Sequence, residues 1–220
     1  MSAKSQTIEH VVLFNVKDET DSTKINSMIT NLNSLTSLDQ VLHLTAGPIL
    51  RNRSSSFKFT HLLHSRYKSK EDLNGYAIHP NHLSVVKESV LPICDDIMAV
   101  DWVSDLEGPM VVKSGSAMRL TFLKLKEDLG ENEKGKVLDV IGGIKDRFDS
   151  IDQISFGENF SARAKGFSIA SVAVFPGLSE LDGLDSSEEM VKEEKEKVKD
   201  LLESVIVLDY VVPASKSANL

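Results

Sequence analysis

The stretch from Tyr76 to His82 is the one whose residue types and spacing most readily support chemistry, because it reads Tyr-x-x-His-Pro-x-His. Tyr76, His79 and His82 place three groups that can take up or release protons within seven residues of one another. An imidazole with an ordinary pKa near 6.5 can remove a proton alpha to a carbonyl group at neutral pH, and this chemistry needs no metal. His10 and His61 precede the stretch in strand-like runs. The sequence therefore raises the hypothesis that these side chains converge on one site.

Two other interpretations of the same residues stay open. Pro80 biases the preceding residue away from helical angles, so the His-Pro-x-His run could end one helix and cap the next, with its imidazoles bonded to the backbone. A zinc site is the second alternative, although no cysteine, HExxH motif or nearby carboxylate supports it. Its ligands would be His10, His61, His79 and His82.

Hydrophobic periodicity predicts the elements that would position these residues. Apolar runs indicate strands at 8–16, 40–45, 57–67 and 97–103, and helical spacing indicates helices at 25–35 and 70–95, the second broken before Pro80. His10 shares strand parity with Val12, and His61 shares it with Leu63, so each histidine lies in an apolar strand face. Both must point to the helix side of the sheet if they are to meet Tyr76 and His82.

The second half of the chain repeats this order. Arg119 to Phe122 echoes Val11 to Phe14, and Val207 to Val211 echoes Ala99 to Val103, both at the same sequence offset. Internal duplication explains these echoes. We therefore divide the chain into a first repeat at 8–103, a Gly-, Pro- and Ser-containing linker at 104–117, a second repeat at 118–211 and a flexible tail at 212–220.

Two such repeats predict an α+β fold. Each ferredoxin-like β-α-β-β-α-β repeat makes a four-stranded antiparallel sheet with helices on one face, and its other apolar face needs cover. Each repeat can cover the other. We expect the two sheets to face each other as an intrachain pseudo-dimeric α/β barrel with the helices outside.

Composition and the chain ends narrow the class of protein. A net charge of −8 argues against nucleic-acid binding, which needs a basic face. No apolar run approaches the length of a membrane span, and Cys94 as the only cysteine suggests a reducing compartment. The final residues Ala218-Asn219-Leu220, with Lys216 just upstream, resemble a variant peroxisomal targeting signal. We predict a peroxisomal location, with the cytoplasm as the alternative.

Several motifs together resemble the stress-responsive dimeric α/β-barrel (Dabb) family, which is found widely in plants. They are Glu9 to Phe14, Phe59-Thr60-His61, Tyr76 to His82 and Val100-Asp101-Trp102. In the second repeat the resemblance is weaker and is carried by Gly157 to Ser161 and Lys165-Gly166-Phe167. Proteins of this family usually form homodimers of one domain. The resemblance therefore implies that this chain is a tandem fusion, which could associate further as a homo-oligomer.

The resemblance implies two alternative functions. Most members are stress-induced or antimicrobial proteins, which implies a stress- or defence-response protein with a small hydrophobic or aromatic ligand in the first repeat. A branch typified by olivetolic acid cyclase performs intramolecular aldol cyclisation, which implies a polyketide-cyclase-like lyase without a cofactor or metal. Matching positions make His82 the general base and Tyr76 the hydroxyl that orients it or polarises a carbonyl. His10, His61 and His79 would bind the ligand.

The second repeat offers an internal comparison. At a constant offset, the positions of His10, His61, Tyr76 and His82 are taken by Met118, Ile169, Leu184 and Met190. We therefore predict that every polar member of the site becomes apolar there, leaving one site per chain. Two basic loops, Arg51-Asn52-Arg53 and Arg163-Ala164-Lys165, would be related by the same pseudo-symmetry. They could meet an anionic group such as a CoA tail, or be ordinary solvated charge.

Overall fold

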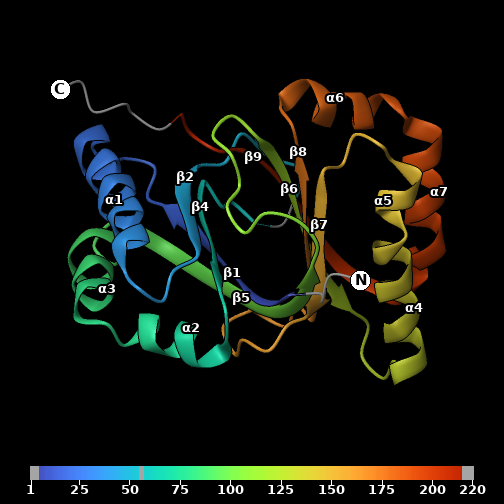
Figure 1. Ribbon diagram of the computed structural model, residues 1–220, viewed down its shortest axis with the longest axis horizontal. Helices are drawn as coiled ribbons and strands as arrows, with labels where there is room; N and C mark the ends of the chain where they lie inside the picture. The colour runs from blue at the N-terminus through green and yellow to red at the C-terminus, as the bar shows by residue number, and fades with distance from the viewer. Residues whose placement is uncertain (1–4, 55–56, 215–220) are drawn as a thin grey trace.

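The computed structural model describes residues 5–54 and 57–214, and it contains the predicted element order in both halves (Figure 1). The first repeat comprises β1 (Ser5–Val16), α1 (Ser22–Ser34), the 3-10 helix η1 (Leu35–Ser37), β2 (His43–Pro48), β3 (Arg51–Asn52), β4 (His61–Tyr67), α2 (Lys70–Ala77), α3 (Pro80–Val85), the π-helical turn η2 (Val86–Val90) and β5 (Cys94–Leu106). The second comprises β6 (Ala117–Leu125), α4 (Glu131–Gly142), α5 (Ile144–Arg147), β7 (Gln153–Glu158), β8 (Ile169–Phe175), α6 (Leu178–Ser186), α7 (Glu188–Val198), the 3-10 helix η3 (Lys199–Leu201) and β9 (Leu202–Val211).

The strands form two antiparallel sheets that lie between two groups of helices. Their orders are β2-β4-β1-β5 and β3-β9-β6-β8-β7. Helices α1 to α3 lie outside the first sheet and α4 to α7 outside the second (Figure 1). The ferredoxin-like α+β prediction is confirmed, but the described strands do not close into one barrel. Among the described residues, backbone strand pairing between the two repeats is limited to β3–β9 and an isolated bridge between Trp102 and Asn159.

Alternation along the strands separates two environments in each repeat. In β1, Val11 and Leu13 point toward the second sheet, whereas Phe14 and Val16 pack under the helices. His10 shares the parity of Phe14, so the predicted helix-side orientation of His10 is correct. The central core between the sheets combines side chains from both halves, among them Val100, Trp102, Leu120, Phe122, Leu208 and Tyr210.

Two local expectations need correction. The strand expected from Phe57 begins only at His61, because Phe59 turns into the central core. The strand expected at 97–103 extends over Cys94–Leu106. The second helical region of the second repeat is likewise divided, into α6 and α7, and Ser187 between them makes no capping hydrogen bond. The C-terminal tripeptide lies outside the described residues, so its role as a targeting signal stays a prediction.

A buried ionic cluster lies in the space between the sheets. Glu9 accepts hydrogen bonds from His64 Nε2 at 2.6 Å and from Arg66 Nε at 3.0 Å, and all three residues are fully buried. Burial by itself would raise the pKa of Glu9, but the charges of Arg66 and His64 outweigh it and lower that pKa to about 2. Arg66 Nη1 also donates to the Met110 carbonyl at 3.0 Å, which ties the segment between the repeats to the first sheet.

His43 beside this cluster should make stability depend on pH. Burial, aided by the charges of His64 and Arg66, lowers its pKa from 6.5 to about 3. Between these values the unfolded chain binds more protons than the folded one, so this contribution is complete above pH 6.5 and is lost as the pH falls toward 3.

We expect His43→Gln to reduce the loss of unfolding free energy between pH 7 and pH 4 by up to about 3 kcal/mol. Urea unfolding of the wild type and the variant at several pH values measures this difference. Parallel pH profiles for the two proteins would contradict the assignment.

Candidate functional site

A cavity of about 750 Å³ lies on the helix side of the first sheet. Strands β1 and β5 supply its floor through residues such as Val12 and Ala99, and helices α2 and α3 supply one wall through Tyr76 and His82. Another part of its lining comes from the second repeat, from the segment Phe160 to Arg163 and from Lys165. The site is therefore built by both repeats, although its titratable groups belong mainly to the first.

His10 on the cavity floor is held by a carboxylate that was not among the predicted site residues. His10 and Asp101 are direct partners across β1 and β5, and His10 Nδ1 lies 2.5 Å from Asp101 Oδ1. Nδ1 therefore carries the hydrogen and donates a hydrogen bond to the carboxylate. Asp101 belongs to the Val-Asp-Trp motif. Its strand position opposite His10 is the sequence feature from which its role in the site could have been predicted. The pair fixes the orientation of the His10 ring.

Tyr76 and His82 both line the cavity and lie against each other there. Their ring centroids are 4.5 Å apart, and His82 Nδ1 donates a hydrogen bond to the Ala77 carbonyl at 2.9 Å. Burial lowers the pKa of His82; the bond to Ala77 opposes this shift, and the charges of His10 and Arg163 add to it. His82 is therefore neutral at neutral pH, with a lone pair left on Nε2. This is the state that a general base requires.

Two buried tyrosines form a chain of hydroxyl groups at the site. The Tyr67 hydroxyl lies 2.9 Å from Ser65 Oγ and also hydrogen-bonds Tyr76. Burial raises the pKa of both phenols, so both keep their protons at neutral pH. The ring of Tyr76 lies 6.3 Å from that of His10, measured between centroids. Tyr76 is thus a neutral hydroxyl held between His10 and His82.

His61 and His79 lie apart from the cavity lining. His61 begins β4 opposite Phe14, and its Nδ1 lies 2.9 Å from Thr60 Oγ1. His79 is the N-cap of α3, and its Nδ1 accepts a hydrogen bond from the Asn81 backbone at 3.2 Å. His79 therefore has the helix-capping role of the alternative interpretation. His82 also hydrogen-bonds the backbone, but only through Nδ1.

The zinc alternative does not fit this arrangement, because its four histidines are not brought together. Only His10 and His82 of the four line the cavity. Over residues 5–54 and 57–214, no group of three or more His, Cys, Asp or Glu side chains could hold a metal ion.

Each repeat passes a short segment to the sheet of the other repeat. Leu50 N donates to the Asp209 carbonyl, and Phe160 N donates to the Asp101 carbonyl, both at 2.8 Å. These segments carry residues that line the helix side of the sheet they join. Each repeat would therefore lose part of its helix-side lining if it were separated from the other.

Glycines allow the close approach at the crossing points. A Cβ atom on Gly157 would lie 2.6 Å from the Val103 carbonyl oxygen, which no other residue type could accommodate without a shift of the backbone, and it would also approach Trp102. A Cβ atom on Gly47 would approach the Tyr210 hydroxyl at 3.3 Å. Trp102 and Tyr210 both lie in the central core. The two crossing points are therefore similar, because each places a glycine against an aromatic residue of the central core.

The strand register corrects one prediction for the second repeat. Strands β1 and β5 pair His10 with Asp101, and β6 and β9 pair Arg119 with Asp209. Arg119, rather than Met118, therefore takes the place of His10, and this position is charged instead of apolar. Equivalent positions in β1 and β6 are therefore separated by one residue more along the sequence than equivalent positions in β5 and β9.

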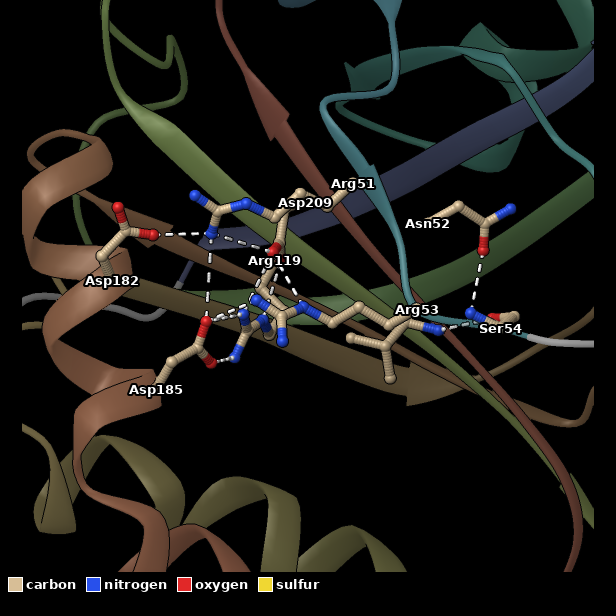
Figure 2. Close-up of polar contacts among 9 residues, drawn as sticks. Arg51, Asn52, Arg53, Ser54, Arg119, Asp182, Asp185 and Asp209 are labelled. Carbon is tan, nitrogen blue, oxygen red and sulfur yellow. Dashed lines mark hydrogen bonds and ion pairs between the residues drawn. The ribbon is translucent and has the colours of Figure 1, made fainter.

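An ionic network occupies the corresponding region of the second repeat (Figure 2). Arg119 Nε donates to Asp209 Oδ1 at 2.8 Å, and Arg119 Nη1 donates to Asp185 Oδ1 at 2.7 Å. Arg53, from the segment passed over by the first repeat, binds the same two carboxylates, with Nε 3.0 Å from Asp209 Oδ2. Arg51 Nη1 adds a bond of 2.6 Å to Asp182. Three arginines thus neutralise three aspartates here.

We expect Arg119→Met to lower the free energy of unfolding by about 3 kcal/mol, because it removes the principal partner of the fully buried Asp209. Arg51→Gln is the matched control in the same network. Its pair with Asp182 is partly exposed, and its contact with Asp209 is longer, at 3.7 Å, so the loss should be much smaller. Chemical unfolding of both variants tests this, and equal losses would contradict a dominant role for the buried pair.

Comparisons with known proteins agree with this architecture. Residues 8–104 and 118–212 match the family described as Stress responsive A/B Barrel Domain, or Dabb. A stress-response A/B barrel domain-containing protein of Arabidopsis thaliana is 56% identical over 218 residues, covering 98% of this chain and 82% of that protein. A second protein of this description from Arabidopsis thaliana is 47% identical over 216 residues, covering 96% of this chain and 99% of that protein.

Solved structures show the same fold at low sequence identity. The crystal structure of an anthrone oxidase-like protein matches with a TM-score of 0.62 and 12% identity, covering all of this chain and 97% of that one. At this identity the match shows the fold alone. No helix in the described part of the chain is long and apolar enough to cross a membrane.

Proposed function

Because this chain belongs to the Dabb family of stress-responsive A/B barrel domains, we propose that it is a stress-response protein whose first repeat binds one small hydrophobic or aromatic ligand. The observation that carries this proposal is the cavity of about 750 Å³, in which apolar side chains surround a few converging polar groups. This combination is typical of small-molecule sites. Roles in plant defence and in peroxisomes stay predictions.

The second repeat supports a ligand role for these polar groups, because the fold forms there without them. Counted from the starts of α2 and α6, Leu184 lies at the position of Tyr76, and both side chains are buried. Counted from the starts of α3 and α7, Met190 lies at the position of His82. Tyr76 and His82 are therefore not required for folding of this kind of repeat.

We expect Val12→Phe to weaken binding of the uncharged fluorescent probe N-phenyl-1-naphthylamine at least about tenfold, because the larger ring enters the cavity from its floor. Thr121 occupies the same position in β6 and is also half-buried. Thr121→Phe is thus the matched control and should bind like the wild type. Fluorescence titration gives the affinity and stoichiometry, and thermal unfolding confirms that both variants are folded.

One probe per chain is the expected stoichiometry for the wild type. Two equivalent probes per chain, or equal effects of the two substitutions, would contradict a single first-repeat site.

The state of His82 favours a second candidate, a polyketide-cyclase-like lyase that catalyses intramolecular aldol cyclisation. His82 Nε2 would take the proton alpha to one carbonyl of a linear substrate. The resulting carbanion would attack a ketone further along the same chain, forming a carbon–carbon bond as the ketone π pair moves to oxygen. The proton would then pass from His82 to that oxygen through Tyr76, whose ring lies against that of His82. The sequence of steps consumes no cofactor.

For this candidate we expect His82→Ala to lower turnover of a linear β-polyketo thioester by about 100-fold or more. His79→Ala is the control: it removes a helix cap and should cost about 1 kcal/mol of stability without changing turnover. Product formation followed by mass spectrometry, together with thermal unfolding, separates the two effects. Absence of turnover in the wild type, or loss of stability alone in His82→Ala, would reject the enzyme and leave the binding protein.

A further inference from the structure

Arg163 and Arg53 occupy equivalent places in the two repeats. Arg53 N donates to the Val207 carbonyl at 2.9 Å, and Ala99 N donates to the Arg163 carbonyl at 3.2 Å. Val207 in β9 and Ala99 in β5 are themselves equivalent, because each precedes the buried aspartate of its strand by the same number of positions. Each arginine is therefore carried by the segment that one repeat passes to the other, and each lies at the helix-side region of the sheet that it joins.

The carboxylates that bind Arg53 have different counterparts around Arg163. In the second repeat, Arg53 pairs with Asp209 and Asp185 (Figure 2). The counterpart of Asp209 is Asp101, which is already bound to His10. The counterpart of Asp185 on helix α2 is Ala77, counted from the starts of α6 and α2. The first repeat thus keeps the cation and lacks the helix carboxylate.

Arg163 consequently brings an uncompensated positive charge to the cavity. Its guanidinium has no ion-pair partner among the described residues, and Arg163 lines the cavity together with Ala77 and His82. Its charge contributes to the lowered pKa of His82. The neighbouring Lys165 is different, because its Nζ already pairs with Asp96 at 2.8 Å. This chain is acidic overall, so the free cation at an apolar cavity is a local feature.

We propose that the first-repeat cavity selects ligands that combine an apolar or aromatic body with a carboxylate, and that Arg163 binds this carboxylate. The inference rests on the proposed ligand-binding function and specifies its ligand class. The ligand carboxylate would take the place that the Asp185 side chain takes in the second repeat. Arginine suits this role because its guanidinium presents paired donors to the two carboxylate oxygens. In the second repeat, the Asp185 side chain already occupies this place.

A matched pair of competitors tests the proposal. 4-Phenylbutyrate and its uncharged isostere 4-phenylbutanamide are each used to displace N-phenyl-1-naphthylamine from the full-length protein. The wild type should bind the acid about tenfold more tightly than the amide, the gain expected from a hydrogen-bonded charge pair. This preference should decrease with added salt, because the guanidinium is exposed at the cavity.

Two variants should remove the preference by different routes. Arg163→Gln removes the cation, and Ala77→Asp supplies the carboxylate that the second repeat has at this position. Both should bring the acid-to-amide ratio close to one, with the probe affinity of each variant measured first so that the ratio is corrected for any change in probe binding. Arg53→Gln, the same change at the equivalent position, should keep the tenfold ratio.

The outcomes distinguish this inference from the function on which it rests. If the probe binds once per chain but the wild type prefers the acid no more than the amide, the carboxylate inference is wrong and the binding function stands. The same conclusion follows if Arg163→Gln keeps the preference. If the wild type binds neither the probe nor the competitors, the proposed function fails, and this inference fails with it.

Discussion

A buried carboxylate at the same position of each repeat, Asp101 in β5 and Asp209 in β9, requires a partner, and the partner determines whether the surrounding space stays open. An ionised carboxylate inside a protein is strongly unfavourable unless it is paired and hydrogen-bonded. His10 satisfies Asp101 with a short, planar side chain from the adjacent strand. Arg119 satisfies Asp209 from the equivalent strand position, but its longer fork also reaches Asp185 on helix α6. The same requirement thus leaves a cavity in one repeat and builds an ionic network in the other.

Much of this arrangement could be predicted from hydrophobic patterns, because those patterns report which face of an element is buried. The parity of β1 places His10 on the helix side, and the internal echoes reveal two copies of one topology. The identity of the residue opposite Asp209 could not be found in this way. An apolar run that is buried on both faces looks the same after a shift of one residue, whereas that shift exchanges the two faces of a strand. The sequence pattern therefore assigns Met118 to the place that the structure gives to Arg119.

The position of a side chain along a strand or helix was harder to predict than the face on which it lies. His61 has the parity of His10, but it lies opposite Phe14, four residues further along β1, which corresponds to roughly 13 Å at strand spacing. His79 precedes a proline that begins a helix, and this local sequence explains its capping role. The pair between Arg53 and Asp185 spans 132 residues of sequence. The hydrophobic periodicity of a sequence carries no information about such a contact, because the contact depends on how the two repeats pack against each other.

Fusion of the repeats into one chain explains how such a difference can exist at all. In a symmetric homodimer, a substitution that fills one cavity with an ionic network fills the other as well, because both interfaces are made from the same residues. Here the copies are free to differ, and two positions account for most of the contrast. His10 against Arg119 decides how the buried carboxylate is satisfied, and Ala77 against Asp185 decides whether the exchanged arginine has a partner within the chain. The capacity for a ligand is therefore encoded at these few positions, and the fold that they share is compatible with either outcome.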